Sequence, residues 1–113
     1  MDRNELEKMT KEYQLLQEQL QSLAMQKEQF SAQKEDYKQA LAEIEKTTGK
    51  IYLAIGGAMV DVAKDKALKD IKDRQESAEM RLGIASKQYD ELSKKEHILR
   101  SGITSALNEL KQA

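Results

Sequence analysis

The chain of 113 residues is short enough to form a single domain over residues 1–113, and 35% of its residues are charged while only 4% are aromatic. This composition is typical of disorder or of long helices, and it argues against a small α/β enzyme, which needs Gly-rich loops and a denser apolar core. Nineteen basic and twenty acidic residues leave a formal net charge of −1, so affinity for nucleic acid is not expected.

Residues 1–46 are predicted to form one long helix. Asp2 can cap its start, with Glu5 three residues on as in a capping box, and Thr47–Gly49 supply its end, where Gly49 suits the left-handed conformation that often follows a helix. Apolar residues step by three and four in turn, which is the a/d pattern of a coiled coil, and this stripe is called the seam below. The seam positions of the first helix are Leu6, Met9, Tyr13, Leu16, Leu20, Leu23, Lys27, Phe30, Lys34, Tyr37, Leu41 and Ile44.

Residues 50–63 are predicted to form a β-hairpin, because β-branched and apolar residues become frequent here and Gly56-Gly57 stands in the middle. A two-residue Gly-Gly loop fits a type I′ or type II′ turn. Residues then lie opposite each other when their numbers add to 113, and side chains alternate between the two faces of the ribbon. One of these faces, called the apolar face below, consists of Ile51, Leu53, Ile55, Ala58, Val60 and Val62.

Residues 65–112 are predicted to form a second long helix with Asp65 as its N-cap. If the chain doubles back, residues whose numbers add to 112 lie level, and every seam position from 6 to 44 then meets a seam position of the second helix. This agreement predicts a mostly α fold, an antiparallel two-helix coiled coil with one β-hairpin at the helix-helix connection. The seam positions of the second helix are Leu68, Ile71, Gln75, Ala78, Leu82, Ala85, Tyr89, Leu92, Glu96, Leu99, Ile103, Ala106 and Leu110.

Some seam positions are polar and need a physical explanation. In the antiparallel register Lys27 and Lys34 each face an alanine, which leaves room for the lysine stem to lie along the seam while its ammonium reaches water. Glu96 faces Leu16, and we interpret it as a feature that sets register or specificity.

The hairpin is predicted to join several chains together. A two-stranded hairpin is marginally stable in water, and this one has an apolar face and two unpaired edges. The coiled coil is too narrow to cover six apolar side chains. We therefore expect hairpins to pair edge to edge and to assemble into an intersubunit sheet or β-barrel. The alternative is that the hairpin folds down onto its own helices.

The hairpin opens with Ile51-Tyr52, turns at Gly56, and leads through the run Val62-Ala63-Lys64-Asp65 into the second helix. With these features the chain resembles the beta-type subunit of prefoldin, especially the archaeal form, over nearly its whole length. Alpha-type subunits of that family have two hairpins, whereas this chain has room for one. The Gln-rich first helix is similar too, with Gln14, Gln17, Gln19, Gln21, Gln26, Gln29, Gln33 and Gln39.

The resemblance implies a jellyfish-shaped hexamer of two alpha and four beta subunits, in which the hairpins build a β-barrel platform and six coiled coils project from it. It implies a molecular chaperone that holds unfolded proteins without ATP and passes them to a group II chaperonin. The expected partners are therefore a prefoldin alpha-type subunit, unfolded client proteins and the chaperonin.

Apolar residues outside the seam indicate where a client would bind. The numbers of Leu15 and Ile98 add to 113, so these residues lie at nearly the same height, and Leu107 lies nearer the chain ends; we expect all three to contact clients. A two-helix seam is expected to fray near its end, where flexible apolar side chains suit varied partners. Fraying would add residues whose main role is seam packing, namely Leu6, Met9, Ile103 and Leu110. Other apolar residues outside the seam, given no function here, are Met25, Met80 and Ile84.

No catalytic constellation is found. His97 takes a solvent-facing heptad position without a second His or Cys for a metal site, and Gly56-Gly57 lacks the downstream Lys-Ser/Thr of a phosphate-binding loop, so no enzyme, metal or cofactor is expected. A second function remains, a structural scaffolding coiled coil whose hairpin oligomerises and whose tip has no client. The absence of cysteine, of a membrane-length apolar stretch and of a signal segment favours a cytoplasmic protein without membrane contact.

Overall fold

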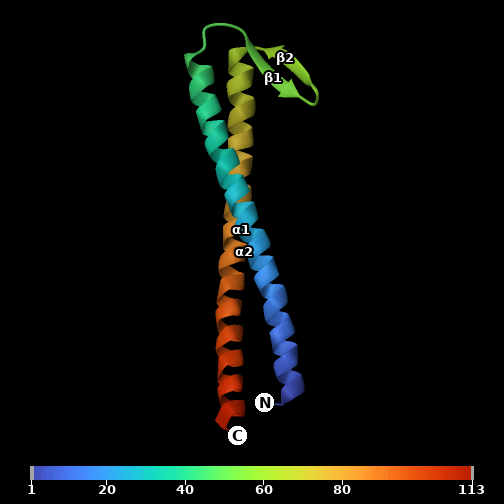
Figure 1. The fold of residues 1–113 in the computed structure, drawn as a ribbon. Helices are drawn as coiled ribbons and strands as arrows, with labels where there is room; N and C mark the ends of the chain where they lie inside the picture. The colour runs from blue at the N-terminus through green and yellow to red at the C-terminus, as the bar shows by residue number, and fades with distance from the viewer. Residues whose placement is uncertain (1, 113) are drawn as a thin grey trace. The chain divides into compact units, whose positions relative to one another are not determined.

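A computed structural model describes residues 2–112 and contains two long helices joined by a two-stranded antiparallel sheet (Figure 1). The elements are α1 (Arg3–Lys46), β1 (Ile51–Ile55), β2 (Ala58–Val62) and α2 (Lys64–Gln112). The expected fold of two helices with one hairpin between them is therefore confirmed. Residue 1, included in the predicted first helix, lies outside the described residues.

The chain divides into two compact units, and both helices contribute to each. The terminal unit joins the residues up to Lys27 with those from Ile84 onward, and the hairpin unit comprises Glu28–Gly83. Within each unit α1 and α2 run antiparallel, so the terminal unit holds both ends of the chain (Figure 1).

The start of α1 has the predicted cap. The carboxylate Oδ1 of Asp2 accepts a hydrogen bond of 2.8 Å from the backbone N–H of Glu5, and the carbonyl of Asp2 accepts the N–H of Leu6 at 3.2 Å. The carboxylate of Asp2 thus satisfies one of the backbone donors that a helix start leaves unpaired, and its carbonyl accepts the first hydrogen bond of the helix itself.

The end of α1 differs from the prediction. The Thr47 hydroxyl donates to the carbonyl of Glu43 at 2.8 Å, and the ammonium of Lys64 donates to the carbonyls of Glu45 at 2.8 Å and Thr47 at 3.2 Å. Among the described residues Gly56 alone has a positive φ, so a left-handed Gly49 is wrong. Because Thr47 and Lys64 already satisfy the last carbonyls, the helix ends without that conformation.

The start of α2 is also corrected. The carbonyl of Ala63 accepts the N–H of Ala67 at 2.9 Å, which makes Ala63 the cap residue instead of Asp65. The strand β2 ends at Val62, so a single residue separates strand from helix and α2 begins at Lys64. Asp65 lies in the first turn, where its carboxylate still interacts favourably with the positive end of the helix dipole.

The hairpin has the register that the sequence predicts. Ile51 pairs with Val62, Leu53 with Val60 and the two residues beside the turn with each other. Gly56 has φ of 61° whereas Gly57 has no positive φ, which selects the type II′ turn from the two expected alternatives. Side chains of the apolar face therefore lie together on one side of the ribbon.

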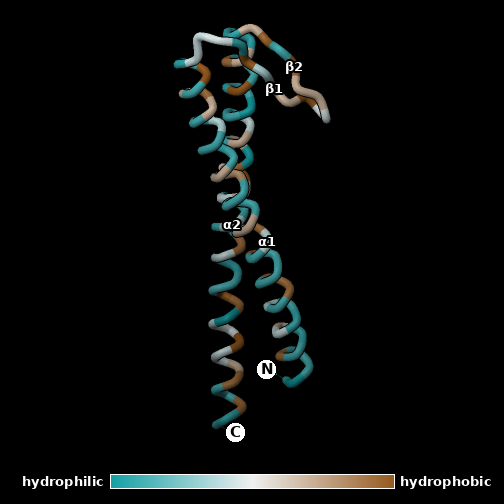
Figure 2. The backbone as a smooth tube through the Cα atoms, turned by 45° about the horizontal axis from the view of Figure 1, so that its top comes forward, coloured by the Kyte–Doolittle hydropathy of each residue, from teal (hydrophilic) through white to brown (hydrophobic). Residues whose placement is uncertain are grey.

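The predicted seam is the buried side of both helices. All the seam positions of α1 are buried or half-buried, and so are those of α2 except Leu110, which is 49% exposed. Figure 2 shows the recurrence of apolar residues along both helices. The ammonium of Lys27 lies 4.5 Å from the centroid of the Tyr89 ring, so it contacts a seam aromatic face instead of extending only into water.

Candidate functional site

The terminal unit carries an exposed apolar surface, called the terminal surface below and formed by Leu15, Ile98, Leu107 and Leu110. Leu15 is 61% exposed and Ile98 is 71% exposed, and the two other leucines are about half exposed. The helices α1 and α2 diverge within this unit toward the two chain ends (Figures 1 and 2). The remaining predicted contact residues are half-buried in the seam, namely Leu6, Met9 and Ile103.

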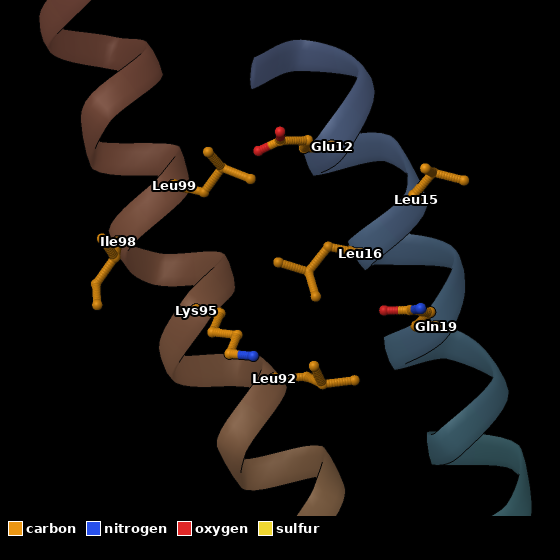
Figure 3. Close-up of a pocket in the computed structure, with 8 residues that line it drawn as sticks. All are labelled: Glu12, Leu15, Leu16, Gln19, Leu92, Lys95, Ile98 and Leu99. Carbon is orange, nitrogen blue, oxygen red and sulfur yellow. The ribbon is translucent and has the colours of Figure 1, made fainter. Parts of the chain in front are cut away.

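An apolar groove of about 450 Å³ lies between the helices of this unit (Figure 3). Leu16, Leu92 and Leu99 point into the space between α1 and α2, whereas Leu15 and Ile98 point away from it, each on the outer side of its own helix. The groove therefore offers an apolar floor with one exposed apolar side chain on each flank. The full lining is Glu12, Leu15, Leu16, Gln19, Leu92, Lys95, Ile98 and Leu99.

A polar layer crosses the seam beside this groove. The Tyr13 hydroxyl donates to Glu96 Oε1 at 3.0 Å and accepts a hydrogen bond of 3.0 Å from the side-chain amide of Gln17. Arg100 Nε lies 3.5 Å from the same carboxylate oxygen, and the Glu96 side chain is 17% exposed. The hydrogen bond to Glu96, with partial desolvation and the charge of that carboxylate, raises the pKa of Tyr13 above its ordinary value.

The seam continues beyond the polar layer toward the chain ends. A Cβ built on Gly102 would lie 3.0 Å from Cε of Met9, so the methionine side chain packs against bare helix backbone at this position. Ala106 is buried, but Leu110, the last seam residue, is exposed. The final turns of the two helices are therefore joined by the half-buried Leu6, Met9 and Ile103 and by the small Ala106.

The hairpin carries a second exposed apolar surface. Along the apolar face Ile51 is buried, but Ile55 is 54% exposed and Val60 is 39% exposed. Leu53 and Val62 are half-buried and Ala58 is exposed, so cover is confined to the base of the hairpin and the half near the turn faces solvent. On the other side of the ribbon Met59 is exposed as well.

A family model described as Prefoldin subunit matches residues 7–112. The chain belongs to the prefoldin family. It is 33% identical over 93 residues to the prefoldin subunit beta of Pyrococcus furiosus, and the match covers 80% of each chain. It is 32% identical over 108 residues to the prefoldin subunit beta of Pyrobaculum neutrophilum, and this match covers 94% of the present chain and 86% of the relative. The resemblance stated from the sequence is confirmed.

The fold agrees with solved structures from the same family. The crystal structure of the prefoldin beta subunit from Thermococcus strain KS-1 has a TM-score of 0.82 and 31% identity, covering 91% of this chain and 92% of that one. The prefoldin beta2 subunit from the same strain has a TM-score of 0.71 at 19% identity, covering 78% of this chain and 96% of that chain, which supports the fold.

The structure adds residues that sequence reasoning assigned to the seam alone. Leu16 and Leu99 form the groove floor as well as packing between the helices, and each directly follows an exposed apolar residue in the sequence. Adjacent apolar pairs of this kind, one inward and one outward, are a signal that could have located the groove in this prefoldin-family chain. Glu12 and Lys95 at its margin were not singled out either.

The other residues singled out from the sequence give no second site. Met25, Met80 and Ile84 are exposed, in line with their interpretation as surface residues. The exposed His97 has its Nδ1 3.2 Å from Nη2 of Arg100. Among residues 2–112 no group of three or more His, Cys, Asp or Glu could hold a metal ion. Neither helix of the described chain contains an apolar stretch that could cross a membrane.

Proposed function

We propose that this prefoldin-family chain is a subunit of an ATP-independent holdase that captures unfolded polypeptides on its terminal surface and passes them to a group II chaperonin. The observation that carries the proposal is the apolar groove flanked by Leu15 and Ile98 in the terminal unit. Unfolded chains expose apolar side chains of varied shape, and exposed Leu and Ile side chains on separate helices offer apolar contacts that require no single partner shape. No catalysis is part of this function.

Assembly through the hairpin supports the same function. Edge-to-edge pairing would remove both free strand edges, and closure of the paired hairpins into a barrel would bury the apolar face. We propose that the hairpins form an intersubunit β-barrel in a hexamer with two prefoldin alpha-type subunits and four chains of the present type. Several terminal surfaces acting on one client would then gain avidity from weak single contacts. We further propose that the chain acts as one domain in the cytoplasm.

The test is suppression of the aggregation of a chemically denatured model protein. Leu15→Ser/Ile98→Ser/Leu107→Ser is compared with wild type, each alone and mixed with an alpha-type subunit. We expect wild type to suppress aggregation at near-stoichiometric ratio and the triple variant to lose most of this effect. The matched control replaces three exposed apolar residues elsewhere, Met25→Ser/Met80→Ser/Ile84→Ser, and should retain suppression.

Circular dichroism and oligomer mass, measured on every variant, separate a binding defect from misfolding. If the terminal and control triples suppress aggregation equally well, the terminal surface is not the client site. If wild type suppresses nothing in any assembly, the holdase proposal fails. The scaffolding function, which needs the hairpin and no client, would then remain.

A further inference from the structure

A small polar groove in the hairpin unit has no part in the function proposed above. It has a volume of about 190 Å³ and is lined by residues of both helices. Two of the four arginines of the chain, Arg74 and Arg81, line it from positions two turns apart on α2. The other lining residues are Gln33 and Tyr37 of α1 and Ser77 and Ala78 of α2. The groove therefore gathers hydrogen-bond donors from α1 and from α2.

The two arginines face uncharged residues across the seam. When Leu68 starts a heptad at position a, both arginines occupy position g, and Gln33 holds the corresponding position on α1. Charged residues at the positions that flank a coiled-coil seam often form ion pairs between the helices. Here the residue that shares the groove from α1 is a glutamine, so the guanidinium charges are not neutralised across the seam.

Arg81 has all its donors available for a ligand. Its side chain forms no ion pair or hydrogen bond within residues 2–112. Arg74 is partly neutralised, because its Nη2 lies 3.1 Å from Oδ2 of Asp70 on the same helix. A guanidinium carries five N–H donors, so Arg74 keeps others beyond this ion pair. The hydroxyls of Tyr37 and Ser77 also form no hydrogen bond within the described part of the chain.

We propose that this groove binds a tetrahedral oxyanion of the phosphate class, either the free ion or the terminal group of a larger phosphorylated molecule. The planar fork of a guanidinium matches two oxygens of a phosphate, and such charge-assisted hydrogen bonds are the strong ones. The volume equals that of about six water molecules in the liquid, which suits one phosphate group. Every residue of the groove belongs to the hairpin unit, so this site is separate from the terminal surface.

The test is a titration of the full chain with sodium phosphate at constant ionic strength, followed by NMR of the arginine Nε–Hε signals. The signals of Arg74 and Arg81 should shift and reach saturation. The signal of Arg100 should not shift, because this residue lies in the terminal unit beside Glu96. Arg81→Gln should weaken binding by about tenfold or more, since it removes the guanidinium that has no other partner. Arg81→Lys keeps the charge without the planar fork and should bind with intermediate affinity.

Lys72→Gln is the matched control. It removes the same charge from an exposed position of α2 in the hairpin unit, and Lys72 does not line the groove. It should bind phosphate as wild type does. The proposal is overturned if Lys72→Gln and Arg81→Gln weaken binding equally, because the effect would then be one of general charge. Shifts that never saturate would overturn it as well.

Two further titrations identify the ligand. Acetate carries a planar carboxylate, and acetate binding as tight as that of phosphate would refute a site for tetrahedral oxyanions. Glycerol 3-phosphate carries the phosphate on a larger molecule. Tighter binding of inorganic phosphate would assign the free ion, and tighter binding of glycerol 3-phosphate would assign a phosphorylated molecule. Because the ligand would contact both helices of the folded chain, binding should also raise the Tm of wild type more than that of Arg81→Gln.

Discussion

Replacing two residues of the apolar face near the hairpin turn should weaken assembly without disturbing the fold of the subunit. Ile55 and Val60 are 54% and 39% exposed, so about half of each side chain is available for contact with another chain. They do not pair with each other in the β1–β2 register, and the backbone hydrogen bonds of the hairpin do not depend on them. The variant Ile55→Ser/Val60→Ser therefore isolates the contribution of the apolar face to association.

The size of the effect follows from the exposed area. Burying an Ile or Val side chain completely stabilises by roughly 1.5–3 kcal/mol, and about half of each side chain remains to be buried here. Each residue is then worth about 1 kcal/mol in the assembled hairpins, or about 2 kcal/mol for the pair. Since every 1.4 kcal/mol corresponds to about a tenfold change in an equilibrium constant, each hairpin contact should weaken on the order of 30-fold.

The assay is sedimentation velocity over a dilution series, with the variant alone and mixed with an alpha-type subunit. The concentration at which the assembly dissociates should rise by at least that factor, while helix content by circular dichroism stays unchanged. Met59→Ser, an exposed residue on the other side of the ribbon, is the control and should dissociate near the wild-type concentration. Equal dissociation of wild type and Ile55→Ser/Val60→Ser would refute burial of the apolar face on assembly.

Two further predictions concern the stability of the subunit. Gly83→Ala should raise the free energy of unfolding by about 0.5–1 kcal/mol, because alanine is a better helix former and an added Cβ meets no atom within 4 Å. Gly56→Ala should lower the free energy of unfolding, because φ is 61° at this position. Thermal and urea unfolding measure both variants, and a destabilised Gly83→Ala would contradict the explanation. Because the pKa of Tyr13 is raised in the folded chain, its stabilising contribution is complete below the ordinary pKa of 10.0 and is lost as pH rises through the higher folded pKa. Wild type should therefore lose more stability than Tyr13→Phe in urea titrations at alkaline pH. Identical pH profiles of stability would show that Tyr13 does not cause the loss.

Periodic features of this chain could be read from its sequence. The burial of the seam follows from apolar residues that are spaced by three and four along both helices. The register of the hairpin follows from its two-residue turn, which allows only one pairing of the residues of β1 and β2. Both are consequences of local geometry repeated along the chain. The capping role of Asp2 was also local, since it needs a backbone donor three residues away.

Two errors arose where residues far apart in the sequence meet. Gly49 was expected to adopt a left-handed conformation at the end of α1, but the ammonium of Lys64 reaches back to the carbonyls of Glu45 and Thr47 instead. The cap of α2 was wrong for a local reason, because the helix begins at Lys64 directly after Ala63, two residues earlier than an Asp65 cap implies. The helix register predicts which residues lie at the same height, but it does not predict where their side chains point. The stacking of Lys27 on Tyr89 depends on that direction.

The two exposed apolar surfaces differ in the kind of partner that they can accept. The apolar face of the hairpin consists of Ile, Val, Leu and Ala on a paired ribbon, and β-branched side chains have few rotamers to lose on burial. Such a surface favours one recurring geometry, as a fixed assembly requires. The terminal surface instead places Leu15 and Ile98 on opposite outer sides of two diverging helices. A partner that contacts both side chains must extend around the outer sides of two helices, which favours an unfolded polypeptide over a rigid, preformed interface.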